Sequence, residues 1–387
     1  MFSEKKPVPV TCRPYRYLWL VLKITSIDIW KRKEKFRFRK ENNNMKKCIK
    51  QIQRIFPFTM CSYLIYMVLG SAAVAIMGEV HPEVIFTYYG INLLTLALWL
   101  AIYKRKITIR NLLYKCDEIS PIFQKKKKDI ANVVNAYLII SALITLLTAS
   151  GSAIVLKHSP PPYRMYYTFF LPLEEGTISC LLTRTIATLL AFITMYFIPC
   201  LVSALCCVVY YMFSDVSGRL SYEFRDMHRK IFHPDEISKL MNIHYLLLQL
   251  LQNVENELSS VSFLLLCSQI LNMYKALATY IALSNDIIFT ALLWDCLPPV
   301  TLIPLSLVGV IWYASRISFH ISNMQASLQL TYNTLLDKDY IPWKTKNFLR
   351  VMLVTEFPKI TSGGHVGIKT SPHFFGLWIV IYIWLVN

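Results

Sequence analysis

The sequence predicts an all-α polytopic membrane protein with seven transmembrane helices, and three observations support this fold class. Hydrophobic residues make up 55% of the 387 positions, charged residues only 17%, and the mean hydropathy is +0.42. Soluble domains average nearer a quarter charged residues, and too few polar side chains are present to cover this much apolar surface in water. In addition, apolar runs recur at membrane-spanning length, and basic residues concentrate in alternate loops.

Seven apolar runs approach or exceed the ~20 residues that a helix needs to cross the hydrocarbon core. The fourth is too long for a simple crossing, and Pro199 predicts a kink or the end of its membrane part. The sixth contains Pro298, Pro299 and Pro304, so it is expected to be bent or broken near its middle. The last is the shortest, with 16 residues. The runs cover residues 56–78, 84–103, 131–155, 178–213, 258–284, 287–314 and 372–387.

The distribution of basic residues predicts the orientation in the membrane. Of the 41 Lys and Arg residues, 37 lie in segments 1–55, 104–130, 214–257 and 315–371. By the positive-inside rule the N-terminus is cytoplasmic, and seven crossings then leave the C-terminus outside. The same bias accounts for the net charge of +18, so no nucleic-acid partner is needed to explain it. The run 125–128 could bind anionic membrane lipid, although its role in topology explains it better.

The cytoplasmic segments are expected to be largely helical. Apolar residues recur at helical spacing in 236–257, which runs into the fifth span without a breaker, and 316–336 continues the sixth span. Residues 17–30 fit either an interfacial helix or a soluble helix packed under the bundle. The predicted organisation is a basic cytoplasmic segment (1–55), a six-span ligand-binding bundle with helical cytoplasmic extensions (56–314), a cytoplasmic anchor region with a re-entry segment (315–371) and a pore-lining last helix (372–387).

Patterns for catalysis and for metal binding are scarce. The sequence has no phosphate-binding Gly-x-x-x-x-Gly-Lys-Ser/Thr loop, no His-Glu-x-x-His and no Gly-x-Ser-x-Gly. The eight histidines are scattered, and only His228 and His233 form a loose group with nearby aspartates. The sequence therefore predicts neither an enzyme nor a cofactor or metal site.

Three ionisable residues lie inside predicted spans, where each is costly unless it faces a polar cavity or a partner: Arg184, Lys275 and Asp295. Asp295 lies eight residues into the sixth span, at about 12 Å depth. One interpretation is a pocket open to the outside that holds a small polar ligand. The other is an internal ion pair of Asp295 with Arg184 or Lys275 that ties helices together. The candidate ligand-binding residues are Trp294, Asp295, Arg184, Tyr280, Tyr89 and Tyr137.

Seven spans with an internal N-terminus resemble the arthropod chemoreceptor superfamily of gustatory and odorant receptors. The segment MNIHYLLLQLLQNVENELSSVSFLLLCSQIL is similar to the family's His-x-x-Leu pattern before the fifth span. The block FPKITSGGHVGI precedes an apolar last helix that contains Ile381-Tyr382. This pair resembles the start of the gustatory Thr-Tyr-five-apolar-Gln-Phe pattern, with Ile381 in place of Thr and without the final Gln-Phe. The gustatory branch fits better than the odorant branch.

The resemblance implies a ligand-gated, non-selective cation channel of the plasma membrane that needs no G protein. The family forms tetramers, here homomeric or heteromeric, whose last helices line one central pore, with a small tastant bound in the outer half of each subunit. It implies Tyr382, Ile383, Val386 and Asn387 as pore-lining residues. The alternatives are an odorant receptor of the same superfamily or a secondary transporter of small solutes; no repeated halves of the transporter kind are visible.

Overall fold

The computed structural model describes residues 15–25, 43–77, 82–119, 130–158, 161–174, 176–227, 234–282, 291–336, 342–358, 361–362 and 366–367. Within these ranges the regular secondary structure is helical apart from two short antiparallel strands. The predicted last span, 372–387, and its four pore-lining residues lie outside them. The elements are α1 (Arg16–Ile24), α2 (Asn43–Met77), α3 (Pro82–Ile119), α4 (Ala131–Val155), η2 (Leu156–His158), α5 (Pro161–Tyr166), α6 (Ile178–Phe192), η3 (Ile193–Phe197), α7 (Ile198–Met227), α8 (Pro234–Ala282), α9 (Ala291–Leu336), α10 (Trp343–Val354), β1 (Thr361–Ser362) and β2 (Val366–Gly367).

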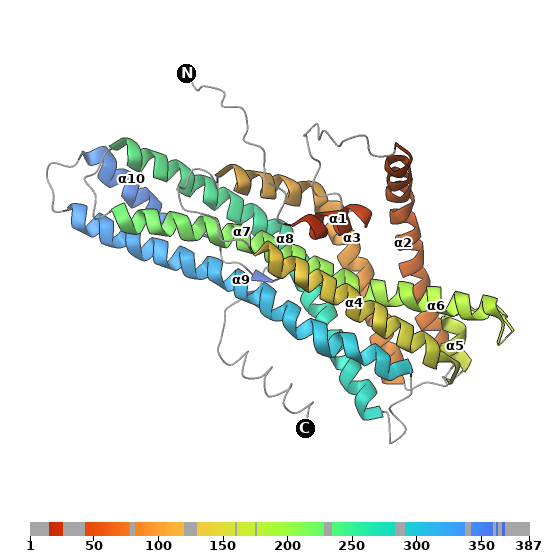
Figure 1. Ribbon diagram of the computed structural model, residues 1–387. Coiled ribbons are helices and arrows are strands. Elements are labelled where there is room, and N and C mark those ends of the chain that lie inside the picture. The colour runs from red at the N-terminus through yellow and green to blue at the C-terminus, as the bar shows by residue number, and fades with distance from the viewer. Residues whose placement is uncertain are drawn as a thin grey trace.

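The long helices form one elongated bundle (Figure 1). Helices α7, α8 and α9 each have one end near α10, whereas α6 and the last turns of α4 lie at the opposite end, near α5. We call these the α10 end and the α5 end. The main contacts of the bundle are made by α7 with α9 and by α3 with α8. Helices α7 and α9 run parallel, since Ser203 bonds Ser306 and Tyr211 packs on Tyr313.

Five helical stretches of the described residues are long and apolar enough to cross a membrane, so the chain is a multi-pass helical membrane protein. They match the predicted first, third, fourth, fifth and sixth spans. The predicted second span, 84–103, lies within α3 and is not among the five. The five stretches are Pro57–Met77, Ala131–His158, Ile178–Asp226, Ile237–Thr279 and Leu293–Leu335.

Prolines lie in the fourth and sixth predicted spans. The kink or membrane end predicted at Pro199 stays a prediction; the chain forms a π-helical turn, η3, that ends at Phe197, and α7 continues through Pro199. For the sixth span the prolines predicted a bend or a break, and the break does not occur: α9 continues through Pro298, Pro299 and Pro304 as one helix. A proline removes only its own N–H from the helical hydrogen bonds, and a neighbouring helix can satisfy the carbonyl that this leaves over.

The predicted helical extensions are confirmed, since α8 begins at Pro234 and α9 reaches Leu336. Of the two alternatives for residues 17–30, the structure favours the packed helix. Leu18 and Leu22 of α1 are almost fully buried in the main hydrophobic core, where α1 contacts α2, α4 and α7. A residue at i and one at i+4 face the same side of a helix, which explains how one face of α1 docks.

A second, smaller core lies toward the α5 end and is unusually aromatic. It contains the buried side chains Tyr88, Tyr166, Tyr167, Phe192 and Tyr196, from α3, α5 and its following turn, α6 and η3. Aromatic side chains bury large areas, and tyrosine adds a hydroxyl that needs a partner inside the membrane. This core therefore combines tight packing with hydrogen-bonding groups, and the candidate site lies beside it.

Candidate ligand-binding site

Two opposite charges meet in the interior of the bundle, on α8 and α9. The side chains of Lys275 and Asp295 are 0% and 1% exposed, and Lys275 Nζ lies 3.5 Å from Asp295 Oδ2. The sequence predicted Lys275 or Arg184 as the ion-pair partner of Asp295. In the structure Asp295 pairs with Lys275. Desolvating two charges is costly, so a buried pair persists only where further hydrogen bonds complete it.

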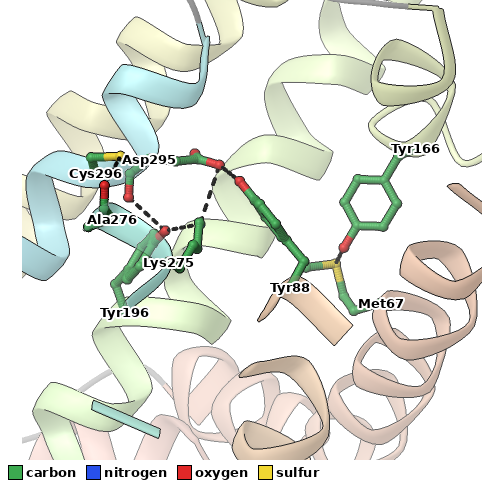
Figure 2. A network of polar contacts seen from close by, with 8 residues as sticks. All are labelled: Met67, Tyr88, Tyr166, Tyr196, Lys275, Ala276, Asp295 and Cys296. Carbon is green, nitrogen blue, oxygen red and sulfur yellow. Dashed lines mark hydrogen bonds and ion pairs between the residues drawn. The ribbon is translucent and has the colours of Figure 1, made fainter. Parts of the chain in front are cut away.

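Two tyrosines complete this pair (Figure 2). The Tyr88 hydroxyl donates to Asp295 Oδ2, and the Tyr88 ring lies against the ammonium, 3.8 Å from Lys275 Nζ to the ring centroid. Lys275 Nζ donates to the Tyr196 hydroxyl at 2.7 Å. We call Tyr88, Tyr196, Lys275 and Asp295 the charged cluster. It links four elements, α3, η3, α8 and α9.

The backbone of α9 explains why Tyr196 belongs to the cluster. In a regular helix the carbonyl of Asp295 would accept a hydrogen bond from the residue four positions later. That residue is Pro299, which has no N–H. The Tyr196 hydroxyl donates to this carbonyl oxygen at 2.9 Å. Tyr196 lies in the π-helical turn η3, a kind of insertion that often marks functional sites because it re-aims side chains.

Trp294, next to Asp295, packs against α4. A Cβ at Gly151 would lie 2.5 Å from the Trp294 ring, so glycine is required for this close approach. The Trp294 Nε1 atom is buried and has no hydrogen-bond partner among the described residues. A buried indole N–H normally finds an acceptor, so this atom is a candidate donor to a bound molecule.

An aromatic loop after α5 folds back against α2. The Tyr66 hydroxyl donates to the Tyr166 carbonyl at 2.5 Å, and the two rings stack at 6.1 Å between centroids. The Tyr166 hydroxyl in turn donates to Met67 Sδ at 2.9 Å (Figure 2). The loop thereby joins α2 to the aromatic core next to Tyr88.

The same loop carries two unusual backbone conformations. Phe169 and Phe170 have φ of 56° and 54°, in the left-handed region, which is rare for bulky residues. Backbone hydrogen bonds of the turn, such as Phe170 N–H to the Met165 carbonyl at 2.8 Å, hold this shape. The Phe169 ring packs against Tyr66 at 5.0 Å between centroids, which helps to offset the strain.

Polar side chains continue from the charged cluster toward the α10 end. Asn92 and Thr95 follow Tyr88 on the buried face of α3, and Asn272 and Ser268 precede Lys275 on the buried face of α8. The two helices are antiparallel here, since Gly90 approaches Leu271 and Arg105 bonds Glu257. Several atoms of this stripe have no hydrogen-bond partner among the described residues: Asn92 Oδ1, Thr95 Oγ1, Ser268 Oγ and Asn272 Oδ1.

The structure brings only part of the predicted ligand-binding set together. Trp294 and Asp295 lie at the cluster, but Tyr89 is 37% exposed, and its neighbour Tyr88 faces inward instead. Arg184 is buried on α6 twelve positions before Tyr196, about 18 Å away along the helix axis. Tyr137 lies fourteen positions before Gly151 on α4, about 21 Å toward the α10 end.

Tyr280 falls within α8, but its side chain lies outside the described residues. Tyr88, Tyr196 and Lys275 are not in the ligand-binding set predicted from the sequence. A signal existed for Lys275, which is a lone cation in an apolar span. A periodicity argument could also have separated Tyr88 from Tyr89, because Tyr88, Ile91 and Asn92 share one face of α3.

Over the described ranges, no three His, Cys, Asp or Glu side chains lie together as a metal site would require.

Comparisons with known proteins identify the fold. No protein-family model matches the chain, and no curated protein sequence matches it. The structure is similar to that of the insect olfactory receptor OR5 from Machilis hrabei, with a TM-score of 0.59, 12% identity, and coverage of 96% of this chain and 97% of that one. The fold is that of an insect olfactory receptor. The same receptor in complex with eugenol gives a TM-score of 0.55 at 11% identity, over 96% of this chain and 98% of that one.

Proposed function

We propose that this protein is a gustatory-type chemoreceptor that acts as a ligand-gated, non-selective cation channel in the plasma membrane. A small tastant binds in the outer half of the bundle and opens a central pore lined by the last helices of four subunits, without a G protein. The observation that carries the proposal is the match to an olfactory receptor over nearly the whole of both chains. The placement of basic residues, which predicts an inverted topology, and the Ile381-Tyr382 pair add support.

We place the ligand site beside the charged cluster, at Trp294 and Asp295, with Tyr88 and Tyr196 replacing Tyr89 and Tyr137 of the sequence-based set. Arg184 and Tyr280 remain proposed members of the wider pocket. The support is physical: ionisable and unpaired polar groups are expensive in a membrane interior and mark functional sites there. A ligand opens the channel only to the extent that it binds the open state more tightly than the closed one.

Whole-cell recording from cells that express the chain tests the proposal, with GDP-β-S in the pipette to block G proteins. A panel of sugars, amines and phenols, including eugenol, should contain at least one compound that evokes a cation current. If the protein reaches the cell surface and no compound of a broad panel evokes a current, the proposal is contradicted. Uptake of a solute without channel-like current would favour the transporter alternative.

With an active compound in hand, Trp294→Ala tests the site. We expect the half-maximal concentration to rise by about tenfold or more, because an interfacial tryptophan anchor contributes on the order of 1–3 kcal/mol. Surface expression should be unchanged. Trp312→Ala is the matched control, since Trp312 lies on the same helix and is 53% exposed. Equal dose–response curves for both variants and the wild type would remove Trp294 from the site.

An odorant receptor of the same superfamily is the second candidate. The observation that favours it is that the two similar structures described above are of an olfactory receptor, in one of them in complex with eugenol. The recordings separate the two candidates: responses confined to volatile apolar compounds support the odorant alternative, and responses to sugars or involatile bitter compounds support the gustatory one.

A further inference from the structure

We propose that the charged cluster is a binding site for a primary ammonium group, filled in this structure by the chain's own Lys275. A ligand that presents an ammonium on a short stem is recognised by the same groups when it displaces that side chain. Only the effect of such a ligand on opening rests on the proposed function. The binding site itself rests on the contacts of the cluster.

Three kinds of partner surround Lys275 Nζ, and each is one that an ammonium prefers. Asp295 Oδ2 supplies a negative charge at 3.5 Å, the Tyr196 hydroxyl accepts a hydrogen bond at 2.7 Å, and the Tyr88 ring presents its face at 3.8 Å. A second ring face, that of Tyr196, lies 5.4 Å away. Carboxylate and aromatic faces together are the common recognition elements for organic cations in proteins.

The hydrogen-bond directions make the site selective for a cationic donor. The Tyr196 proton is committed to the Asp295 carbonyl, and the Tyr88 proton to Asp295 Oδ2. The lone pairs of the Tyr196 hydroxyl therefore face the centre of the site. Tyr88 presents the face of its ring there. A neutral alcohol could use only one of these contacts, and an anion would be repelled by Asp295.

The Lys275 side chain can move along α8 when another ammonium replaces it. Its side chain is long and flexible, and such chains move their charge toward water along an apolar surface. Thr279 lies one turn further along the same buried face of α8, and the described part of this helix ends at Ala282. That end is about 10 Å along the axis from Lys275.

Chemical rescue of Lys275→Ala tests the inference. Removing one member of a buried pair is strongly destabilising, so the melting temperature of the purified variant in detergent should fall by roughly 5 °C or more. Ethylammonium chloride at millimolar concentration should restore most of this loss, whereas ethanol and tetramethylammonium chloride should not. The double variant Lys275→Ala/Asp295→Leu should not respond to ethylammonium. Equal effects of ethylammonium and ethanol on Lys275→Ala would overturn the inference.

If Lys275→Ala does not fold alone, the same comparison is made during expression. Ethylamine crosses membranes in its neutral form, so cells grown with it should yield monodisperse variant, and cells grown with ethanol should not. Absence of rescue in that setting also overturns the inference. These results stand apart from the channel proposal: rescue without any current from the wild type would contradict the channel alone, and current without rescue would contradict the ammonium site alone.

Discussion

The carbonyl oxygen of Asp295 explains, at the scale of single residues, why the charged cluster and the prolines of α9 depend on one another. Pro299 leaves that carbonyl without its helical partner, and Tyr196 donates to it at 2.9 Å. The same hydroxyl accepts from Lys275. One tyrosine therefore satisfies a backbone acceptor and a buried cation, both of which would be costly if left unpaired inside a membrane.

We expect Tyr196→Phe to lower the free energy of unfolding by about 2–4 kcal/mol, because it leaves two buried groups unsatisfied. Pro299→Ala restores an N–H to the helix, so adding it to Tyr196→Phe should recover part of the loss. Thermal unfolding of the four proteins in a double-mutant cycle measures this coupling. Tyr89→Phe, at an exposed position of α3, is the control. Strictly additive effects of the two changes would contradict the proposed dependence.

Only some residues of the charged cluster could be predicted from the sequence. A charge in an apolar span is visible in the sequence, and that signal located Asp295, Lys275 and Arg184. Which of two cations pairs with Asp295 depends on helix packing, which no local pattern encodes. Tyr196 could not be predicted either, because no pattern in the sequence marks the π-helical turn in which it lies.

At the scale of elements, the aromatic loop after α5 is the main feature that the sequence did not reveal. Residues 156–177 have the composition of an ordinary connecting loop, and its aromatics resemble a membrane-interface belt. In the structure Tyr166 and Tyr167 are buried between helices instead. By contrast, the continuous α8 was predictable, because apolar spacing runs from its first turns into the fifth span without a breaker. The continuity of α9 was not, because its three prolines predicted a bend or a break.

Docking of this loop predicts protection from proteolysis. Chymotrypsin applied to intact cells should cleave Tyr66→Ala in the segment 166–170 several times faster than the wild type, because the variant loses the hydrogen bond and ring stacking that hold Tyr166. Gel mobility of a tagged chain measures the cleavage. Tyr245→Ala, at a position 60% exposed on α8, is the control. A wild type cleaved as fast as Tyr66→Ala would show that the loop is not held by α2.

The last helix lies outside the described residues, and its role as the pore lining is a proposal. An apolar constriction closes a pore by excluding water, so a polar side chain there should wet it. We expect Ile383→Ser to raise the basal cation current several-fold at equal surface expression. Val308→Ser, at a 44% exposed position of α9, is the control. An Ile383→Ser variant with an unchanged basal current would indicate that this helix does not line the pore.

For the whole molecule, the orientation predicted in the membrane is the reverse of that of G-protein-coupled receptors. The fold class followed from composition, apolar run length and the placement of basic residues, all of which are averages over many positions. The orientation rests on the basic residues alone, because the helical bundle by itself has no inside or outside.

Epitope tags at both termini, probed on intact and then permeabilised cells, test the orientation. We expect the N-terminal tag to need permeabilisation and the C-terminal tag to be accessible on intact cells. An accessible N-terminus would overturn the inverted arrangement and favour G-protein coupling. Two internal termini would mean that 372–387 does not cross, which would favour a six-span transporter.

Reconstitution shows whether this chain itself forms the channel, because it removes every other protein. The purified chain in liposomes, addressed with a compound that evokes current in cells, should give single-channel openings that carry both Na⁺ and K⁺. We expect openings that depend on the compound and that are less frequent in Trp294→Ala at the same compound concentration. Compound binding without any cation conductance in the purified protein would contradict it.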